Sequence, residues 1–361
     1  MSMRMADVNA QPRHILIIKP SALGDIALAL PALSSLRASF PQARITWLVR
    51  DEFAPLLEGA KDVDDVLLFD RKGLGKWWRH PKAFVSLLRF FGDLRKGRFD
   101  LVVDLQGLFR TAFFGWVTRS RRRIGMKDSR ELAGLFYTNQ VGQNDGNAHV
   151  IDYYHKVVAA AGCSTIVDKC NFAASPGWLA RARQLLAEQG EGDYVVFVTG
   201  SAHPAKCWPI ERFAALADRI DTAFGLPVVA VGGRGEKETV EKLRGLSRAR
   251  VLDLAGRTDI GALAGVLSGA RLVVSNDTGP GHIAVALGAP VIIIFGRTNP
   301  MRIAPYKKEH SFVAVDPEGR GRAIASDDPR HRIEEISVDS VFAEAAYHLA
   351  GTCDAQPAGP R

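Results

Sequence analysis

The stretch His14-Ile-Leu-Ile-Ile-Lys19 passes directly into Pro20-Ser-Ala-Leu-Gly-Asp25. The first part is a short, uninterrupted apolar run, which is typical of a strand buried on both faces of a parallel sheet. Pro20 and Gly24 indicate a tight turn, after which a helix is expected over about 25–39. A buried strand that leads through a short turn into a helix is the start of a βαβ unit. This stretch therefore predicts an α/β protein.

Strands and helices alternate through the rest of the chain, as in parallel sheets covered by helices on both faces. In the first half we expect strands at 44–49, 63–69 and 101–104, and helices near 52–58, 82–95, 111–117 and 151–161. A linker at 168–176 precedes a second series, with strands at 194–198, 227–231, 250–252, 272–274 and 291–295 and helices at 209–223, 236–243, 260–267 and 281–287. The predicted organisation is a flexible tail at 1–13, Rossmann-like domains at 14–172 and 173–335, and a C-terminal helix and tail at 336–361.

The composition is that of a globular protein with two domains. With 361 residues, of which 47% are hydrophobic and 24% charged, disordered, collagen-like and coiled-coil proteins are excluded. The longest apolar stretch, 283–295, is too short to span a bilayer, and the N-terminal 14 residues lack the apolar core of a signal peptide. We therefore expect a cytoplasmic protein. The four scattered cysteines form no C-x-x-C pair and are expected to be reduced.

Positive charge is concentrated in one segment. The chain has 47 Lys or Arg and 39 Asp or Glu, a net charge of +8. Residues 71–130 contain 16 Lys or Arg and four acidic residues, a net charge of +12, which leaves −4 for the remainder. Solvated surfaces account for many such runs, but two basic runs in one half favour an anionic ligand. The denser run contains Arg119, Arg121, Arg122, Arg123, Lys127 and Arg130.

Common nucleotide-binding and metal-binding motifs do not occur. There is no Walker A segment and no G-x-G-x-x-G fingerprint, and Gly232-Gly-Arg-Gly235 lacks the required spacing. Asp62-Val-Asp64 has the spacing of a metal-diphosphate motif, but it leads directly into a strand and is better explained as a polar strand start. The nine histidines form no H-E-x-x-H pair. The sequence therefore predicts no metal site and no cofactor.

Three loops at the carboxyl ends of expected strands are candidate sites, because ligands of open α/β sheets bind at that edge. The first loop ends at Asp25, the first charged residue of the following helix. An acidic residue there commonly complements the helix dipole. Asp25 also suits a general base exposed at a cleft, because the helix N-terminus keeps its carboxylate ionised.

The second loop is Thr199-Gly-Ser-Ala-His-Pro-Ala-Lys-Cys-Trp-Pro209. Hydroxyl groups, free backbone N–H groups and one lysine are the parts needed to hold a diphosphate without a metal. Lys206 is either the cation that neutralises a departing diphosphate or an ordinary solvated lysine. Trp208 is explained equally well by core packing.

The third loop is Val274-Ser-Asn-Asp-Thr-Gly-Pro-Gly-His282. It presents hydroxyl and N–H donors at a helix N-terminus, which indicates an anion or sugar site. Asp277 is suited to accept hydrogen bonds from sugar hydroxyls, and His282, one turn into the helix, is placed to reach the same ligand. Ordinary helix capping accounts for Thr278 and Pro280 without any ligand.

At these loops the sequence resembles the bacterial heptosyltransferases, the inverting family 9 glycosyltransferases that build the inner core of lipopolysaccharide. The resemblance extends over about 15–300, and the order and spacing of its segments are specific to the family: Ile17-Ile-Lys-Pro-Ser-Ala-Leu-Gly-Asp25, Leu30-Pro-Ala-Leu33, Asp104-Leu-Gln-Gly-Leu108, Ala205-Lys-Cys-Trp-Pro209, Ser275-Asn-Asp-Thr-Gly-Pro-Gly-His282 and Phe295-Gly-Arg-Thr-Asn-Pro300. Arg130-Glu-Leu-Ala-Gly-Leu-Phe-Tyr137 further resembles the branch that adds the first heptose.

The resemblance implies a GT-B fold, with two Rossmann-like domains facing a central cleft. It implies metal-independent transfer of heptose from ADP-heptose to Kdo on lipid A, with Asp25 as general base and Lys206 at the departing diphosphate. The implied donor site comprises Thr199, Ser201, Lys206, Glu236, Asp277, Thr278, Gly279 and His282. The implied acceptor site comprises Ser21, Gly24, Gln106, Arg119, Arg121, Arg122, Arg123, Lys127 and Arg130. Peripheral association with the cytoplasmic face of the inner membrane would bring the basic domain to this anionic acceptor.

Some features depart from the first-heptose branch. The loop before Lys206 is about two residues longer, Gly-Pro-Gly-His282 is closer to the branch that adds the second heptose, and 316–332 has no match. Second-heptose transfer, or transfer of another sugar by a member of the same family, is therefore an alternative. Two alternatives come from other classes of protein. A nucleic-acid-binding protein would explain the basic charge, but the sequence has no accompanying zinc or helix-turn-helix signal. A non-catalytic nucleotide-sugar-binding module would not require Asp25.

Overall fold

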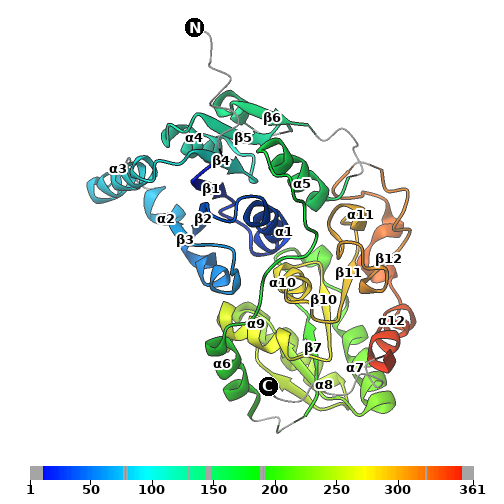
Figure 1. The fold of residues 1–361 in the computed structure, drawn as a ribbon. Coiled ribbons are helices and arrows are strands. Elements are labelled where there is room, and N and C mark those ends of the chain that lie inside the picture. Colours follow the sequence, from blue (N-terminus) through cyan, green and yellow to red (C-terminus); the bar gives the residue numbers. More distant parts are fainter. Residues whose placement is uncertain are drawn as a thin grey trace. The chain divides into compact units, whose positions relative to one another are not determined.

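The computed structural model describes residues 11–75, 78, 80–128, 131–142, 148–187, 190, 192–321 and 323–351. Residues 1–10 of the tail predicted at 1–13 lie outside these ranges, as do 352–361 and Arg130. The chain divides into two compact units, one ending at Phe172 and the other beginning at Ala173 (Figure 1). Each unit is built on a six-stranded parallel sheet. The predicted α/β class with two Rossmann-like sheets is confirmed.

The first sheet has the strand order β3-β2-β1-β4-β5-β6. Its strands are β1 (His14–Ile18), β2 (Arg44–Arg50), β3 (Asp65–Phe69), β4 (Leu101–Asp104), β5 (Arg122–Met126) and β6 (Asn139–Val141). The α-helices of this unit are α1 (Leu23–Ser39), α2 (Arg71–Leu74), α3 (Pro81–Lys96), α4 (Phe109–Val117) and α5 (Val150–Ala160), and the 3-10 helices are η2 (Asp51–Gly59) and η3 (Ala133–Phe136). The central position of β1 explains why its aliphatic side chains are fully buried.

Strands β5 and β6 are not predicted by the sequence analysis, which treats 119–130 as a basic surface. Arg122 and Arg123 begin β5, and only its centre is buried. A strand that begins with two arginines and has only two buried residues produces no apolar run, so the periodicity argument fails there. β5 nevertheless continues the parallel sheet, with Leu101 opposite Arg122 and Asp104 opposite Gly125.

The second sheet has the strand order β12-β11-β10-β7-β8-β9. Its strands are β7 (Val195–Val198), β8 (Val228–Val231), β9 (Val251–Asp253), β10 (Leu272–Asn276), β11 (Val291–Phe295) and β12 (Phe312–Ala314). The α-helices are α6 (Pro176–Leu186), α7 (Ile210–Phe224), α8 (Lys237–Leu246), α9 (Ile260–Ser268), α10 (Gly279–Leu287), α11 (Pro300–Ile303) and α12 (Val338–Gly351), with short 3-10 turns η5 (Pro204–Lys206) and η6 (Arg234–Glu236). The expected C-terminal helix is present as α12, which buries Val341, Ala345 and Leu349 in the core of this unit.

Because the strands of each sheet are parallel, the loops after their carboxyl ends begin along one edge. In the first unit, the loops after β1, β3 and β4 lead into α1, α2 and α4 along this edge. In the second unit, 199–209 follows β7, Gly232–Glu236 follows β8 and Asp277 follows β10. The candidate loops of each unit therefore begin along that edge.

Candidate functional site

A buried carboxylate joins two of the predicted loops in the second unit. Asp277 is 5% exposed, and its Oδ2 lies 2.5 Å from Lys206 Nζ while its Oδ1 lies 3.4 Å from His282 Nε2. Burial acts to raise the pKa of Asp277, but the hydrogen bond and charge of His282 and the charge of Lys206 outweigh it and lower that pKa. The Lys206 side chain is 32% exposed. Its ammonium group is therefore fixed by Asp277 and still accessible to a ligand.

Asn276 holds the loop that carries Lys206. Its side chain is fully buried, its Oδ1 accepts a hydrogen bond from Trp208 N at 3.0 Å, and its Nδ2 donates to Thr199 O at 2.7 Å. Trp208 is itself in the core, where its Nε1 donates to Ile336 O. Asn276 thus links both ends of the loop between β7 and α7. Asn276 is not among the predicted site residues, and its position directly before Asp277 is the signal in the sequence that points to it.

A pocket of about 290 Å³ opens along the same edge, close to the lower limit for small-molecule sites. Its lining combines apolar side chains from β7, β8 and α9 with polar groups from the loops. The residues are Val198, Gly200, Ser201, Ala202, Val231, Gly232, Gly233, Glu236, Thr258, Asp259, Ile260, Leu263, Thr278 and Pro280. An apolar wall with a few polar groups suits the base and ribose of a nucleotide. Thr258, Asp259 and Leu263 were not predicted, because nothing in their local sequence marks a ligand site.

Two glycines make room for Glu236 in this pocket. A Cβ atom on Gly200 would lie 2.0 Å from Glu236 Oε1, and one on Gly232 would lie 2.7 Å from Oε2. The Glu236 carboxylate in turn accepts a hydrogen bond from Gly233 N. Glu236 is therefore held between the loops that follow β7 and β8, and side chains at those glycines would displace it.

Buried polar atoms without a protein partner lie in the same loops. Among the described residues, Thr199 Oγ1 and His282 Nδ1 are buried and have no hydrogen-bond partner. Leaving such an atom unsatisfied costs about 1–3 kcal/mol, so a polar ligand that reaches them would relieve that cost. Thr278 and Gly279 begin α10, where the first backbone N–H groups have no partner within the helix and attract anions. The predicted donor residues are thus gathered within one unit.

In the first unit, Asp25 lies in the first turn of α1 and is half-buried. Its Oδ2 accepts a hydrogen bond from Ala22 N at 2.9 Å. The other carboxylate oxygen has no hydrogen-bond partner among the described residues. Asp25 therefore acts as a helix cap and still has one oxygen available for a proton.

A buried lysine accompanies Asp25 and was not predicted. Lys19 is 4% exposed, its Nζ donates to Leu105 O at 3.2 Å, and it lies 5.5 Å from the centre of the Tyr154 ring. Burial acts to lower the pKa of Lys19, but its interactions with Tyr154 and with the charge of Asp25 outweigh it and raise that pKa. The ammonium group therefore stays charged close to Asp25. Tyr154 lies on α5, far from Lys19 in the sequence, so the contact between them could not be predicted from the sequence.

Gln106, a predicted acceptor residue, follows β4 beside a buried carboxylate. Asp104 accepts hydrogen bonds from Gln106 N at 2.8 Å and from the Tyr137 hydroxyl at 2.8 Å. Burial raises the pKa of Asp104 despite these bonds. Gln106 Oε1 is buried and has no hydrogen-bond partner in the described part of the chain. The Gln106 side chain is therefore available to bind a ligand, and Asp104 fixes the turn that presents it.

The predicted basic cluster is divided by the sheet. Arg119 and Arg121 precede β5 and therefore lie toward the amino edge, whereas Lys127 follows β5 at the carboxyl edge. Because a strand rises about 3.3 Å per residue, the two ends of this five-residue strand are separated by more than 10 Å. Arg122 Nη2 donates to Ala161 O and Arg123 Nε donates to Phe136 O, so both guanidinium groups help to hold the unit together. Lys127 therefore lies at the carboxyl edge, as Asp25 does, whereas the four arginines lie at the amino end of β5.

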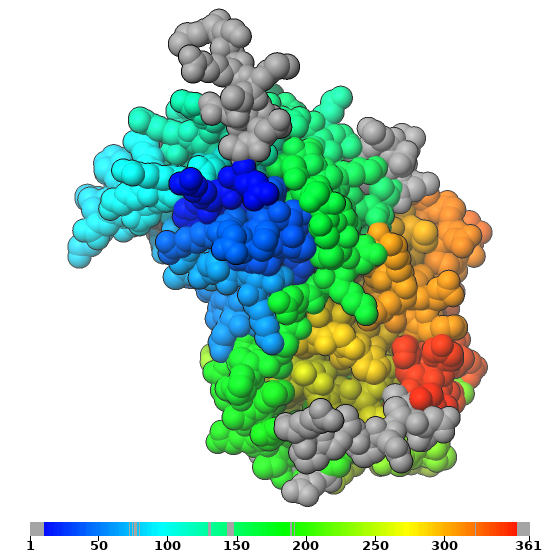
Figure 2. Space-filling view, in the orientation of Figure 1, coloured from blue at the N-terminus to red at the C-terminus, as the bar shows by residue number. Residues whose placement is uncertain are grey.

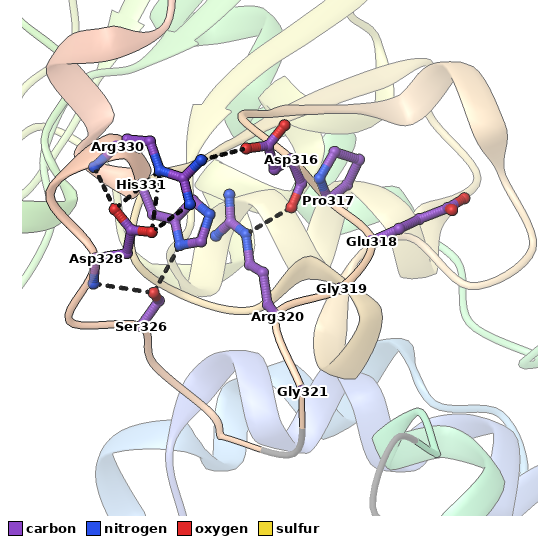
Figure 3. Close-up of a pocket in the computed structure, with 10 residues that line it drawn as sticks. All are labelled: Asp316, Pro317, Glu318, Gly319, Arg320, Gly321, Ser326, Asp328, Arg330 and His331. Carbon is purple, nitrogen blue, oxygen red and sulfur yellow. Dashed lines mark hydrogen bonds and ion pairs between the residues drawn. The ribbon is translucent and has the colours of Figure 1, made fainter.

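The segment after β12, for which the sequence analysis finds no counterpart, lines a second pocket (Figure 3), although the family match reported below extends to residue 327. Arg320 donates to Gly296 O at 2.6 Å and Thr298 O at 3.0 Å, which ties the segment to the end of β11. Arg330 lies 2.7 Å from Asp328, and its hydrogen bonds lower the pKa of Asp328 to about 2. His331 Nδ1 lies 2.6 Å from Ser326 Oγ. These polar side chains satisfy one another, which indicates a folded loop rather than an open charged site.

The described residues contain neither a cluster of metal ligands nor a helix that could span a membrane. Across the described ranges, no group of three or more His, Cys, Asp and Glu side chains is arranged to hold a metal ion. Asp62 accepts hydrogen bonds from Ser34 Oγ and Asn171 Nδ2, and Asp64 pairs with Arg37, so both carboxylates serve the structure. Of the helices that the structure describes, none is long and apolar enough to cross a membrane.

Comparisons with known proteins identify the family of the chain. Residues 87–327 match glycosyltransferase family 9 (heptosyltransferase). The lipopolysaccharide heptosyltransferase 1 of Pseudomonas aeruginosa is 30% identical over 84% of this chain and 84% of its own. The lipopolysaccharide core heptosyltransferase OpsX of Haemophilus influenzae is 27% identical over 84% of this chain and 85% of its own.

Solved structures are similar over almost the whole chain. The family 9 glycosyltransferase of Veillonella parvula has a TM-score of 0.79 at 24% identity and covers 94% of this chain and 97% of its own. Escherichia coli heptosyltransferase WaaC with ADP-2-deoxy-2-fluoro heptose has a TM-score of 0.71 at 25% identity and covers 92% of this chain and 99% of its own.

The two Rossmann-like units and these similarities define a glycosyltransferase of the GT-B fold, as the sequence predicted. The chain belongs to glycosyltransferase family 9, the heptosyltransferases.

Proposed function

We propose that this enzyme transfers heptose from ADP-heptose to Kdo on lipid A, with inversion at the anomeric carbon. The observation that carries the proposal is the Lys206–Asp277–His282 cluster beside the pocket that contains Glu236. It combines a fixed cation, a carboxylate and a mixed apolar and polar cavity at the carboxyl edge of one sheet. These are the groups needed for the diphosphate, the sugar hydroxyls and the nucleoside of a nucleotide sugar.

For the donor, we place the adenosine in the pocket, with Glu236 at its ribose or base. Lys206 and the N–H groups at the start of α10 bind the diphosphate, with the hydroxyls of Thr199 and Ser201 as further donors. Asp277 accepts hydrogen bonds from the heptose, and His282 supports its orientation. As ADP departs, the positive potential at Lys206 and α10 stabilises the growing negative charge without a metal.

For the acceptor, Asp25 is the general base. Its free oxygen removes the proton of a Kdo hydroxyl while that hydroxyl oxygen bonds to the anomeric carbon of heptose and the bond to the diphosphate breaks. Lys19, whose pKa is raised, keeps a positive charge close to Asp25. We assign acceptor contacts to Ser21, Gly24, Gln106 and Lys127, which lie at or after the carboxyl ends of β1, β4 and β5.

The location that fits this reaction is the cytoplasmic face of the inner membrane, where a peripheral protein would meet its lipid-linked acceptor. The high positive charge of 71–130 supports attraction to such a surface. Transfer of the second heptose is a second candidate, favoured by the Gly-Pro-Gly-His282 segment.

The test is incubation of the purified protein with ADP-heptose and Kdo-lipid A, with products identified by mass spectrometry. We expect ADP and a singly heptosylated lipid in equal amounts. Binding of ADP-heptose without a transferred product, for any inner-core acceptor, would instead identify a nucleotide-sugar-binding module and contradict the proposal.

A further inference from the structure

Helix α3 carries an apolar stripe that the first unit does not cover. Phe90 and Leu94 face the core, whereas Phe84, Val85 and Leu88 are 44%, 45% and 52% exposed. Figure 1 shows α3 on the outside of its unit, and Figure 2 shows the corresponding cyan residues projecting from the surface. A helix that packs against one side only normally exposes polar residues on the other. α3 departs from that pattern over a little more than one turn.

The stripe continues onto α4 through aromatic side chains. The Phe91 ring of α3 lies 5.8 Å from the Phe113 ring of α4, and Phe113 stacks on Trp116 at 5.6 Å. Phe109 and Trp116, seven positions apart on the same face of α4, are 42% and 49% exposed. We call this continuous surface, from Phe84, Val85 and Leu88 to Phe109 and Trp116, the α3–α4 surface.

An apolar pocket of about 570 Å³ opens between the two helices. Leu87 and Phe91 line it from α3, and Phe109, Phe113 and Phe114 line it from α4. Its volume and composition suit a hydrocarbon chain rather than a polar ligand. The pocket adjoins the exposed stripe. Leu87 lies three positions after Phe84 and Phe91 lies three positions after Leu88, so each pair is adjacent on the helix surface.

Cations surround this apolar area. Lys82, Arg89 and Lys96 recur at seven-residue spacing and form a line along α3 beside the stripe. Arg71 and Arg110 line the pocket itself, and neither has an ion-pair partner among the described residues. Burial and the adjacent charge of Arg71 lower the pKa of Arg110, which agrees with a crowding of positive charge there.

We propose that the α3–α4 surface docks the protein onto a bilayer that contains anionic phospholipids. The stripe enters the interface between headgroups and acyl chains, the pocket takes up an acyl chain, and the line of cations lies among the phosphates. An apolar stripe bordered by Lys and Arg is the arrangement of helices that lie in a membrane interface. This inference rests on the proposed function, since it names the surface that brings the enzyme to its lipid-linked acceptor.

Charge complementarity selects the bilayer over a second copy of the chain. In a two-fold symmetric dimer the same patch faces itself, so the line of Lys82, Arg89 and Lys96 would oppose its own copy. Like charges in such a contact are unfavourable. An anionic bilayer instead raises the affinity about fivefold for each cation near its surface.

The test is flotation of the full-length protein with vesicles of phosphatidylcholine containing 0 or about 30% phosphatidylglycerol, a strongly anionic surface, without lipopolysaccharide or nucleotide. We expect binding to the anionic vesicles that weakens as salt is added. Val85→Gln/Leu88→Gln and Lys82→Glu/Arg89→Glu should each reduce that binding by at least about tenfold. The matched controls Ile166→Gln/Leu246→Gln and Lys169→Glu/Arg183→Glu change equally exposed residues elsewhere and should bind like the wild type.

Either of two outcomes contradicts the proposal of a docking surface. Equal vesicle binding by the test and control variants would overturn it, as would a change in oligomeric mass caused by Val85→Gln/Leu88→Gln without any vesicle binding by the wild type. Transfer to a water-soluble Kdo acceptor should be unchanged in the α3 variants, which also verifies that they are folded. If the wild type fails to transfer heptose to the water-soluble acceptor, this result contradicts only the proposed function, because the flotation assay contains neither ADP-heptose nor a Kdo acceptor.

Discussion

Lys206 Nζ lies 2.5 Å from Asp277 Oδ2, and the two side chains come from loops after different strands, β7 and β10. The carboxylate is buried while the ammonium group remains partly exposed. A cation fixed in this way needs no further reorganisation to stabilise a departing diphosphate, which is the role that we propose for Lys206.

Replacing the cation tests its role in catalysis. We expect Lys206→Met to lower kcat/KM by about 10²–10³, because loss of one preorganised group that stabilises developing charge has an effect of that size. Steady-state kinetics with ADP-heptose measure it. Lys242→Met, which removes an exposed lysine paired with Glu211 on the outside of the same unit, is the control. A loss of less than tenfold for Lys206→Met would contradict the assignment.

The ionisation of Asp277 predicts how stability depends on pH. The pKa of Asp277 is lower in the folded protein than in the unfolded chain, so its charge stabilises the fold above the unfolded value of about 3.9, and this contribution is lost as pH falls through the folded value. Asp277→Asn leaves Lys206 and His282 without their anion. At pH 7 it should reduce the free energy of unfolding by about 3–5 kcal/mol.

Urea denaturation of both proteins measures this effect. The difference in unfolding free energy between wild type and Asp277→Asn should stay constant from neutral pH to about pH 5 and then narrow below about pH 4. A difference that persists unchanged under acid conditions would show that the carboxylate charge is not its source.

Asp25→Asn separates catalysis from folding at the proposed base. The amide oxygen of asparagine can still accept the hydrogen bond from Ala22 N, so the start of α1 should be preserved. We expect turnover to fall by more than about 10², while the affinity for ADP-heptose, measured by calorimetry, stays within about twofold because the proposed donor site lies in the other unit. Activity within tenfold of the wild type would rule out Asp25 as the base.

Two glycines in the second unit give a paired test of the nucleotide pocket. Gly200→Ala would place a methyl group 2.0 Å from Glu236 Oε1 and must displace that carboxylate, whereas a Cβ atom on Gly235 would meet nothing within 4 Å. We expect Gly200→Ala to raise the Kd for ADP by at least about tenfold and Gly235→Ala to leave it unchanged. Similar affinities for both variants would place the nucleoside elsewhere.

Much of the fold could be predicted because its strands are short apolar runs. The central strands β1, β7, β10 and β11 are buried on both faces, so every side chain in their middle is apolar. Edge strands such as β6 and β12 are exposed or half-buried, and no periodicity distinguishes them from loops. The same reason explains why the basic residues around β5 suggested a surface instead of a strand.

Residues of the candidate site could be predicted only where a single loop forms a recognisable motif. Lys206, Asp277 and His282 belong to segments recognisable by themselves, and the parallel sheet brings them together. Other residues act through contacts with residues far away in the sequence, and a single sequence does not reveal such contacts. These residues are Asn276, Lys19 and Tyr154. The division of Arg119 and Arg121 from Lys127 likewise depends on the strand register.

The central claim is that the acceptor is Kdo before any heptose has been added. Initial rates with ADP-heptose and either Kdo-lipid A or its singly heptosylated form, followed by ADP release and by the mass of the lipid product, test it most directly. We predict that kcat/KM for Kdo-lipid A exceeds that for the heptosylated lipid by at least about 10², a difference of about 2.7 kcal/mol in transition-state binding. A preference for the heptosylated lipid would contradict the claim and identify the enzyme as one that adds the second heptose.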